Sequence, residues 1–482
     1  MGFASRVFQR TLLFASLVAL AAGCATVGPD FERPEVETPE AYQRMPPPED
    51  VTVNLRWWEL FSDPVLKDLV VRALAYNQDV QIATSRIEQA RAALGFTQAD
   101  QYPAVDISAG ASAGNFSGGA RQVNDIGTAF IAPPLNWEID FWGRFRRATE
   151  SARAELLASE YALRTVQIGL ISEVVAAYYR LLDFHQRLEV TFDTLQNRVK
   201  GLEIIQQRFY AGIIPEIDVN QATIQKEIAQ EAIPLYEREI ARTEHALSLL
   251  LGSLPAEIRT GAKLNEQPFP PDVPTGLPSA LLERRPDIAE AMARLEAQTA
   301  RIGVAEALRL PAIRLTGAAG LATTDLGSIT TEGGVWSIGG SLLGPVIDFG
   351  KSRQRVRIEE AATQEALHRY ELSVLRAFRE VEDALAGIRT YRKQYQAVER
   401  RRDAAQRTLE LAQDRYDQGI TSYLEVLDSD RSLFEVELER SDITQQYFSA
   451  YVALYKALGG GWLTPAEEEE AAAAEATSDE KL

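Results

Sequence analysis

The clearest pattern of apolar and polar positions runs from Gly143 to about Tyr210. Apolar residues recur there at every seventh position, namely Val174, Leu181, Leu188, Leu195, Leu202 and Phe209. A strict seven-residue repeat predicts a helix that packs as a coiled coil. At a rise of 1.5 Å per residue, this helix would be roughly 100 Å long. Such a rod is too long for the core of a compact globular domain.

A second seam of the same kind lies later in the chain. Its members are Val381, Ile388, Tyr395, Leu409 and Tyr416, with an interruption at Arg402. Each long helix is followed by a reversal and a return helix, predicted at Asp218 to Leu251 and at Tyr423 to Leu458. Pro234 lies inside the first return helix, where its missing N–H predicts a kink.

The two reversals match one another in sequence. Subtracting 207 from the positions of RYDQGITSYLEVLD (Arg415 to Asp428) reaches RFYAGIIPEIDVNQ (Arg208 to Gln221) and places Gly419 on Gly212. Glycine takes the positive φ that a tight reversal needs. Matching reversals predict that the chain consists of two copies of one unit.

Four other stretches alternate between small apolar and polar residues with a period of two. They run over Ala104–Gly114, Thr128–Asp140, Ala312–Leu321 and Val335–Ile347, and a helical stretch, Pro64–Asp100, precedes the first. Strands of about ten residues with this alternation are typical of transmembrane β-barrels. A half-buried sheet of a soluble protein gives the same alternation, so both interpretations stay open.

Four strands are too few to close a membrane barrel, because the smallest use about eight. An open sheet edge in lipid would leave backbone groups unpaired, at a cost of several kcal/mol each. Other chains must therefore complete a membrane sheet. A dimer would supply eight strands and a trimer twelve, and the pattern alone does not choose between them.

Composition excludes several classes of function. The net charge of −19 disfavours nucleic acid as a partner, and three His and one Cys exclude a disulfide framework or a multi-cysteine metal site. No nucleophile motif or phosphate-binding loop occurs, so the sequence predicts no enzyme, no cofactor and no metal. A coiled-coil scaffold of the cell envelope would explain the helices but not the alternating strands.

The first residues predict export and lipidation. Met1 to Cys24 combines Arg6 and Arg10 with a short apolar core and ends in LAAGC, which resembles a bacterial lipobox. That resemblance implies that Cys24 carries lipid and that the protein is sorted to the outer membrane. Ala25 to Pro48, rich in Pro and Glu, predicts an extended and poorly structured tether.

Several motifs together resemble the TolC-like outer-membrane efflux factors, in the lipoprotein branch of drug-efflux channels. They are CATVGPDFERP at Cys24, RWWELFSDPVL at Arg56, WEIDFWGRFRR at Trp137, LLERRPDI at Leu281, GPVIDFG at Gly344, the second reversal, and YKALGGGW at Tyr455. The resemblance implies a mixed α and β membrane protein, a homotrimer with a 12-stranded transmembrane β-barrel and an α-helical periplasmic tunnel. It also implies a periplasmic adaptor, an inner-membrane efflux transporter, and drugs or other small toxic molecules as cargo. A duct for type I protein secretion is the alternative.

The resemblance also implies a periplasmic gate at the reversals. Acidic side chains at Glu425 and Asp428 would ring the narrowest point and favour cations. In similar channels, the positions of Arg415 and Tyr416 carry links that hold the tips closed. Arg415 is also the nearest cation in sequence to the acidic pair, and we expect Asp218 of the first reversal as its partner across the interface. The turns, at Gly212 and Gly419 and at the capping residues Thr421 and Ser422, would contact the adaptor.

These patterns divide the chain into six parts. Residues 1–23 are the signal peptide and 24–60 the lipid-anchored extended segment. The first repeat covers 61–255, a linker 256–285, and the second repeat 286–460. Residues 461–482 form an acidic tail that we expect to be disordered.

Overall fold

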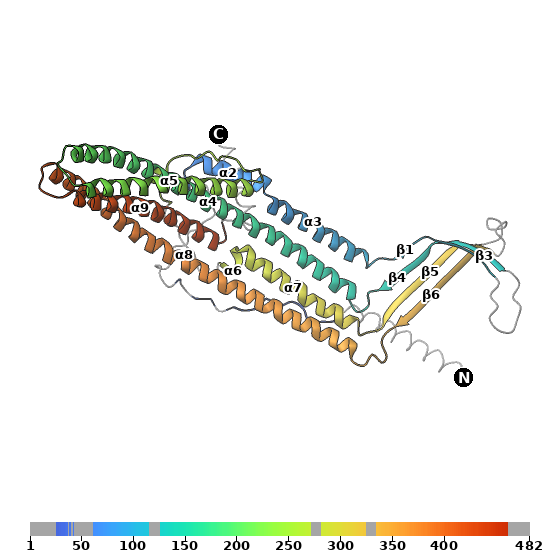
Figure 1. The fold of residues 1–482 in the computed structure, drawn as a ribbon. Coiled ribbons are helices and arrows are strands. Elements are labelled where there is room, and N and C mark those ends of the chain that lie inside the picture. The colour runs from blue at the N-terminus through green and yellow to red at the C-terminus, as the bar shows by residue number, and fades with distance from the viewer. Residues whose placement is uncertain are drawn as a thin grey trace, which may run out of the picture. The chain divides into compact units, whose positions relative to one another are not determined.

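The computed structural model describes residues 26–36, 38–39, 42, 61–114, 126–270, 281–323 and 334–460. The expected signal peptide, Cys24 and the acidic tail lie outside these residues. The elements, shown in Figure 1, are α2 Pro64–Tyr76, α3 Gln78–Ala99, β1 Ala104–Val105, β2 Ser108–Gly114, β3 Ile126–Ala132, β4 Pro134–Ile139, α4 Arg144–Tyr210, α5 Glu216–Leu250, η2 Leu264–Glu266, α6 Leu281–Arg284, α7 Pro286–Ala307, β5 Ala312–Thr323, β6 Gly334–Leu343, α8 Lys351–Asp417 and α9 Tyr423–Ala457.

The chain forms two compact units, and each takes residues from both halves of the sequence. Unit 1 comprises Met1–Glu35, Ser85–Glu160 and Glu290–Glu371, and so holds the strands. Unit 2 comprises Val36–Thr84, Tyr161–Ala289 and Leu372–Leu482, and holds both reversals. The long helices α4 and α8 contribute residues to both units.

The two long helices and the two return helices are confirmed. Helices α4 and α8 each contain 67 residues, α5 and α9 each contain 35, and α3 and α7 each contain 22. Helix α5 continues through Pro234. Within the described residues, no helix combines the length and the apolar character needed to cross a membrane.

The helical stretch expected from Pro64 to Asp100 is wrong in one respect, because it is two helices. Asn77 separates α2 from α3, and its Oδ1 accepts the N–H groups of Asp79 (2.9 Å) and Val80 (3.2 Å). Its Nδ2 donates to the carbonyl of Leu250 at 2.9 Å. An asparagine side chain that satisfies the first amides of a helix favours a new helix start over continuation.

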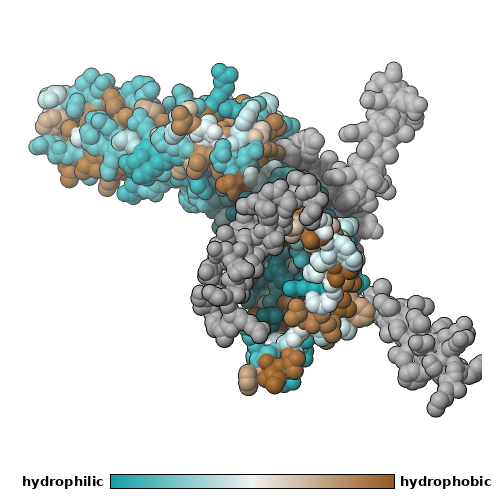
Figure 2. All heavy atoms as spheres, turned by 90° about the vertical axis from the view of Figure 1, so that its right-hand side faces the viewer, coloured by the Kyte–Doolittle hydropathy of each residue, from teal (hydrophilic) through white to brown (hydrophobic). Residues whose placement is uncertain are grey.

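One antiparallel sheet contains all the strands of the described residues, in the order β1-β4-β5-β3-β2, with β6 on β5. The register places Trp137 opposite Leu315 and Glu138 opposite Arg314. Because neighbours along a strand point to opposite faces, one face carries Trp137, Leu315 and Ile338, and the other carries Glu138, Arg314 and Ser341. Figure 2 shows hydrophobic residues gathered over these strands.

The four expected strands are present, but two of them are interrupted. Asp106 and Ile107 separate β1 from β2, and Pro133 separates β3 from β4. The interruptions face one another, since the N–H of Asp106 donates to the carbonyl of Pro134 at 3.1 Å. Consecutive prolines have no N–H to donate, so the ladder is incomplete there. The last strand was expected to reach Ile347, but it ends at Leu343.

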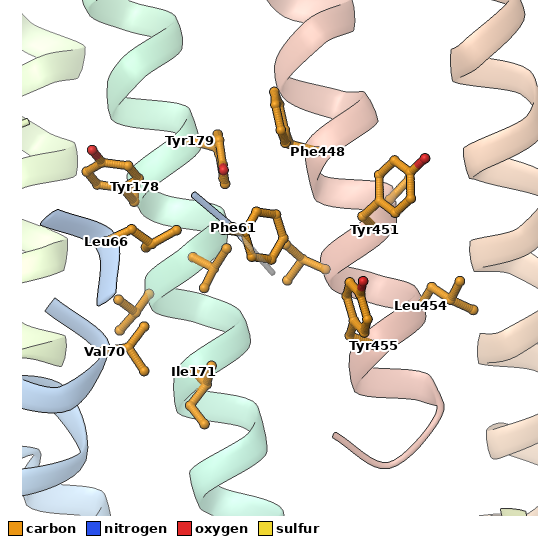
Figure 3. Packing of buried hydrophobic residues seen from close by; sticks show 14 of the residues in the cluster. Phe61, Leu66, Val70, Ile171, Tyr178, Tyr179, Phe448, Tyr451, Leu454 and Tyr455 are labelled. Carbon is orange, nitrogen blue, oxygen red and sulfur yellow. The ribbon is translucent and has the colours of Figure 1, made fainter. Parts of the chain in front are cut away.

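Aromatic and aliphatic side chains form the largest core, within unit 2. Figure 3 shows Phe61 of the segment before α2 between residues of α4 and α9. The rings of Tyr179 and Phe448 stack with centroids 4.2 Å apart. Asp63 accepts a hydrogen bond from the hydroxyl of Tyr178 at 2.5 Å. This core fixes α2, α4 and α9 against one another.

Candidate functional site

Both long helices end in the same backbone motif at the reversals. At the second reversal, the N–H of Gly419 donates to the carbonyl of Tyr416 (3.0 Å) and that of Ile420 to Arg415 (2.8 Å). This Schellman pattern pairs carbonyls that a helix end would otherwise leave unpaired. Gly212 in the first reversal has the same φ of 72° as Gly419. Nothing lies within 4 Å of a Cβ built on either glycine, so the positive φ explains the residue type.

Arg415 and Glu425 form an ion pair across the second reversal. Nη1 of Arg415 lies 3.4 Å from Oε1 of Glu425, and the side chains are 53% and 40% exposed. The hydroxyl of Thr421 donates to the other oxygen of Glu425. The capping prediction is half right: Ser422 occupies the N-cap position of α9, but its side chain makes no capping hydrogen bond. The N–H of Glu425 bonds instead to the carbonyl of Ser422, at 3.2 Å.

Arg208 connects the two reversals. Its Nη2 lies 3.1 Å from Oδ1 of Asp417, and its guanidinium lies 4.7 Å from the ring centroid of Tyr416. Tyr416 is buried in a small apolar cluster with Ile205 and Val426. A cation over an aromatic face contributes about 0.5–1 kcal/mol at an exposed site. Tyr416 thus joins the two hairpins, whereas Arg415 stabilises only its own hairpin within this chain.

Glu425 and Asp428 have different partners. Asp428 is 65% exposed and pairs with Arg431, at 2.6 Å. Glu425 is held by Arg415 and Thr421. Asp218 lies at the start of α5, where its N–H bonds to the carbonyl of Pro215 at 3.2 Å. Within the described part of this chain, Asp218 forms no ion pair with Arg415, and its expected role across an interface stays a prediction.

The polar face of the sheet carries a second group of charges, within unit 1. Glu138 is only 14% exposed and pairs with Arg314 (3.1 Å) and Arg144 (3.0 Å). The opposite face presents large apolar residues to the exterior of this chain, with Ile107 and Ile338 each 81% exposed. The sheet therefore has one charged face and one exposed apolar face.

Comparison with known proteins identifies the family. Residues 69–253 and 277–460 match the family described as outer membrane efflux protein. The chain belongs to this family. It is an outer-membrane efflux protein, and its place of action is the outer membrane.

The efflux protein resembles relatives over almost its whole length. It is 35% identical to the solvent efflux pump outer membrane protein SrpC of Pseudomonas putida, over 94% of this chain and 98% of that one. It is 31% identical to the probable outer membrane lipoprotein SilC of Salmonella typhimurium, over 95% and 100%. The structure of the outer-membrane channel OprN matches with a TM-score of 0.84 and 30% identity, over 91% and 100%.

The sequence of this efflux protein predicts the two reversals but not the contacts between them. The sequence match marks Arg208 only as the counterpart of Arg415, whereas in the structure it contacts Tyr416 and also Asp417, 209 residues away. No local spacing reveals such a pair. Thr421 precedes α9 and Glu425 lies in its first turn, so their hydrogen bond crosses the start of the helix and the spacing rules for pairs within one helix do not predict it. Among the described residues, no group of three or more His, Cys, Asp or Glu could hold a metal ion.

Proposed function

We propose that three copies of this chain form the outer-membrane channel of a tripartite efflux pump. Four extended segments per chain give twelve strands in a trimer, enough for a barrel with an aqueous bore. The long helices continue that bore as a periplasmic tunnel. A periplasmic adaptor protein and an inner-membrane transporter deliver the cargo to it.

The two-faced sheet with two unpaired edges carries this proposal. Among the described strands, β6 pairs only with β5, and β2 pairs only with β3. Unpaired strand edges are unfavourable in lipid, because their N–H and carbonyl groups have no water to bond. Further copies of the same sheet remove both edges and place the faces of Leu315 toward lipid and Arg314 toward the bore.

We propose drugs, solvents or other small toxic molecules as the cargo. This rests on the names of relatives, which include the solvent efflux protein SrpC and the toluene efflux pump outer membrane protein TtgI of Pseudomonas putida, also 35% identical. Type I secretion of a protein is the alternative use of the same channel. A strain without this chain that becomes sensitive to solvents but secretes its proteins normally favours efflux, and the reverse favours secretion.

We also propose that Cys24 carries lipid, so that a surface anchor accompanies the barrel. A relative named as a probable outer membrane lipoprotein supports this. Cys24→Ser should leave an unacylated precursor that mass spectrometry detects. A mature N-terminus elsewhere, without acyl chains, would refute the assignment.

Recordings in planar bilayers test the channel itself. Purified protein should give discrete conductance steps with a preference for cations, because the proposed gate carries Glu425 and Asp428. A coiled-coil scaffold would give no steps. Crosslinking in cells, followed by mass spectrometry, would identify the inner-membrane partner and the adaptor expected at Gly212 and Gly419.

A further inference from the structure

The first described residues after Cys24 are docked against the folded chain, in contrast to the loose tether that composition predicts. We call residues 26–30 the N-terminal strap. The N–H of Val27 donates to the carbonyl of Trp142 at 3.2 Å, at the connection between β4 and α4. Both residues of this hydrogen bond belong to unit 1.

Three glycines allow the strap to approach closely. Gly28 has a φ of 93°, and a Cβ built on it would overlap the backbone of Gly303 in α7. In turn, a Cβ on Gly303 would lie 2.7 Å from the carbonyl oxygen of Val27 and 2.8 Å from Cγ of Arg147. A Cβ on Gly143, whose φ is 78°, would lie 2.5 Å from the methyl carbon of Thr26. No other residue type fits these positions without displacing the strap.

The side chain of Arg147 binds the strap by hydrogen bonds. Its side chain is only 4% exposed. Nε donates to the carbonyl of Val27 and Nη2 to that of Gly28, each at 3.2 Å, and Nη2 lies 2.7 Å from the carboxylate of Asp30. Nη1 is occupied by Glu150, at 2.8 Å. The guanidinium therefore recognises two backbone carbonyls and one side chain of the strap, a geometry that a lysine could not reproduce.

The same helix position in the other repeat lacks this slot. The first halves of the repeats match under a shift of 208, which places Asp79 on Asp287 and Pro103 on Pro311. Gly95 of α3 then corresponds to Gly303, and nothing lies within 4 Å of a Cβ built on Gly95. An open position tolerates any small residue, whereas the Gly303 position does not. The close packing at Gly303 is therefore particular to the strap rather than a general requirement of this helix.

We infer that Gly143, Arg147 and Gly303 form a docking slot that fixes the N-terminus, and with it the lipid, at the junction of the sheet and α4. Only Ala25 separates Thr26 from Cys24, so a lipid on Cys24 is carried within about 7 Å of Thr26. The position of the lipid rests on the proposed acylation of Cys24. The slot thereby converts a flexible anchor into one that sets the position of the acyl chains relative to the strands.

Limited proteolysis of the purified full-length protein in detergent tests the slot. Glu32 is exposed and lies just beyond the strap, so a glutamyl endopeptidase can release residues 24–32 when the strap undocks. Gly303→Ala should increase the rate of release at least tenfold, and Gly28→Ala should do the same from the side of the strap. Gly95→Ala is the matched control and should release the peptide at the parent rate.

The outcomes separate the slot from the lipid assignment. Parent-like release from both Gly28→Ala and Gly303→Ala would overturn the slot. If Gly303→Ala disturbs α7, the result for Gly28→Ala is decisive, because that change is in the strap and leaves the helix sequence unaltered. The mass of the released peptide reports acylation independently. A bare peptide released slowly from the parent would refute the lipid on Cys24 and leave the slot intact.

Discussion

At the scale of single residues, the second reversal already holds the pair that stabilises it. Arg415 pairs with Glu425 of its own chain at 3.4 Å. Each such exposed pair contributes only about 0–1 kcal/mol. In the proposed trimer, three symmetric copies acting on one two-state gate would add, however, so small pairs can set the resting state of the proposed gate.

If Arg415 holds the proposed gate closed, Arg415→Ala should loosen the tip and raise single-channel conductance several-fold. Arg407→Ala is the matched control, because it removes an exposed arginine of the same helix that pairs with Glu410, outside the proposed gate. Planar-bilayer recordings measure both. If Arg415→Ala conducts like the parent, Arg415 does not hold the gate.

Asp428→Ala should weaken cation selectivity and reduce block by multivalent cations. Asp428 is 65% exposed, so its charge remains available to ions despite its pairing with Arg431. Glu435→Ala provides the control, since Glu435 is also exposed and also lies near Arg431, at 3.9 Å. Reversal potentials in a salt gradient measure the preference. An unchanged preference in Asp428→Ala would place the selectivity elsewhere.

Glu437 on α9 gives a pH-dependent prediction. Burial raises its pKa. The charges of Arg402 and Arg440 lower the pKa, and those of Asp193 and Asp430 raise it, with a net rise. The folded protein therefore binds this proton more readily than the unfolded chain, so the ionised group costs stability at neutral pH, and the cost disappears as the pH falls through the raised pKa. Glu437→Gln should raise the melting temperature modestly at pH 7 and less at acidic pH. A gain that grows on acidification would contradict this.

At the scale of elements, periodicity predicted the helices and strands but not their interruptions. The seven-residue seam defines α4 and α8 because each residue of the seam contributes to the same buried face. The break at Asn77 depends on one side chain that also reaches Leu250, 173 residues away. The gap between β1 and β2 arises from Pro133 and Pro134 on the opposing strand, so it is not visible in the sequence of either strand alone.

The alternation of the strands predicts their reactivity. Ile107 and Leu315 lie on the apolar face, and Asp106 and Arg314 lie on the other. Single cysteines at Asp106 and Arg314 should react with polar thiol reagents, and those at Ile107 and Leu315 should be protected in membranes. Each protected position has an adjacent reactive one as its control. The opposite pattern would reverse the faces of the sheet, since a one-residue slip inverts every side chain.

At the scale of the whole molecule, the internal match extends from sequence to structure. The paired helices α4 and α8, α5 and α9, and α3 and α7 have equal lengths. We propose that this reflects duplication of one unit, as the matching reversals predict. The sequence does not predict which elements of the two repeats contact one another, because similar elements from either repeat could occupy the same position in the fold.

The duplication predicts how neighbouring copies of the chain meet. Within the sheet, Ala104 lies opposite Asn136 and Ala312 lies opposite Leu343. The shift between repeats is therefore 208 for the first strand and 207 for the second. Between repeats, Leu135 of β4 lies opposite Gly317 of β5. Adding 207 to the position of Leu135 gives Leu342, and subtracting 208 from that of Gly317 gives Ala109. If the seam between copies repeats the seam within one, Leu342 lies opposite Ala109 of the next copy.

Cysteines at these positions test the seam. Directly opposed residues in an antiparallel pair have Cβ atoms about 4.5–5.5 Å apart, within reach of a disulfide or a short thiol crosslinker. Leu342→Cys combined with Ala109→Cys should therefore give crosslinked dimers and trimers on oxidation. Cys24 is the only native cysteine, so it is the only other residue whose thiol could form a crosslink. Gly340→Cys with Ala109→Cys is the control, since it lies on the same face but two residues out of register. Stronger crosslinking in the control would shift the seam, and no crosslinking in either pair would mean that β6 and β2 do not meet between copies.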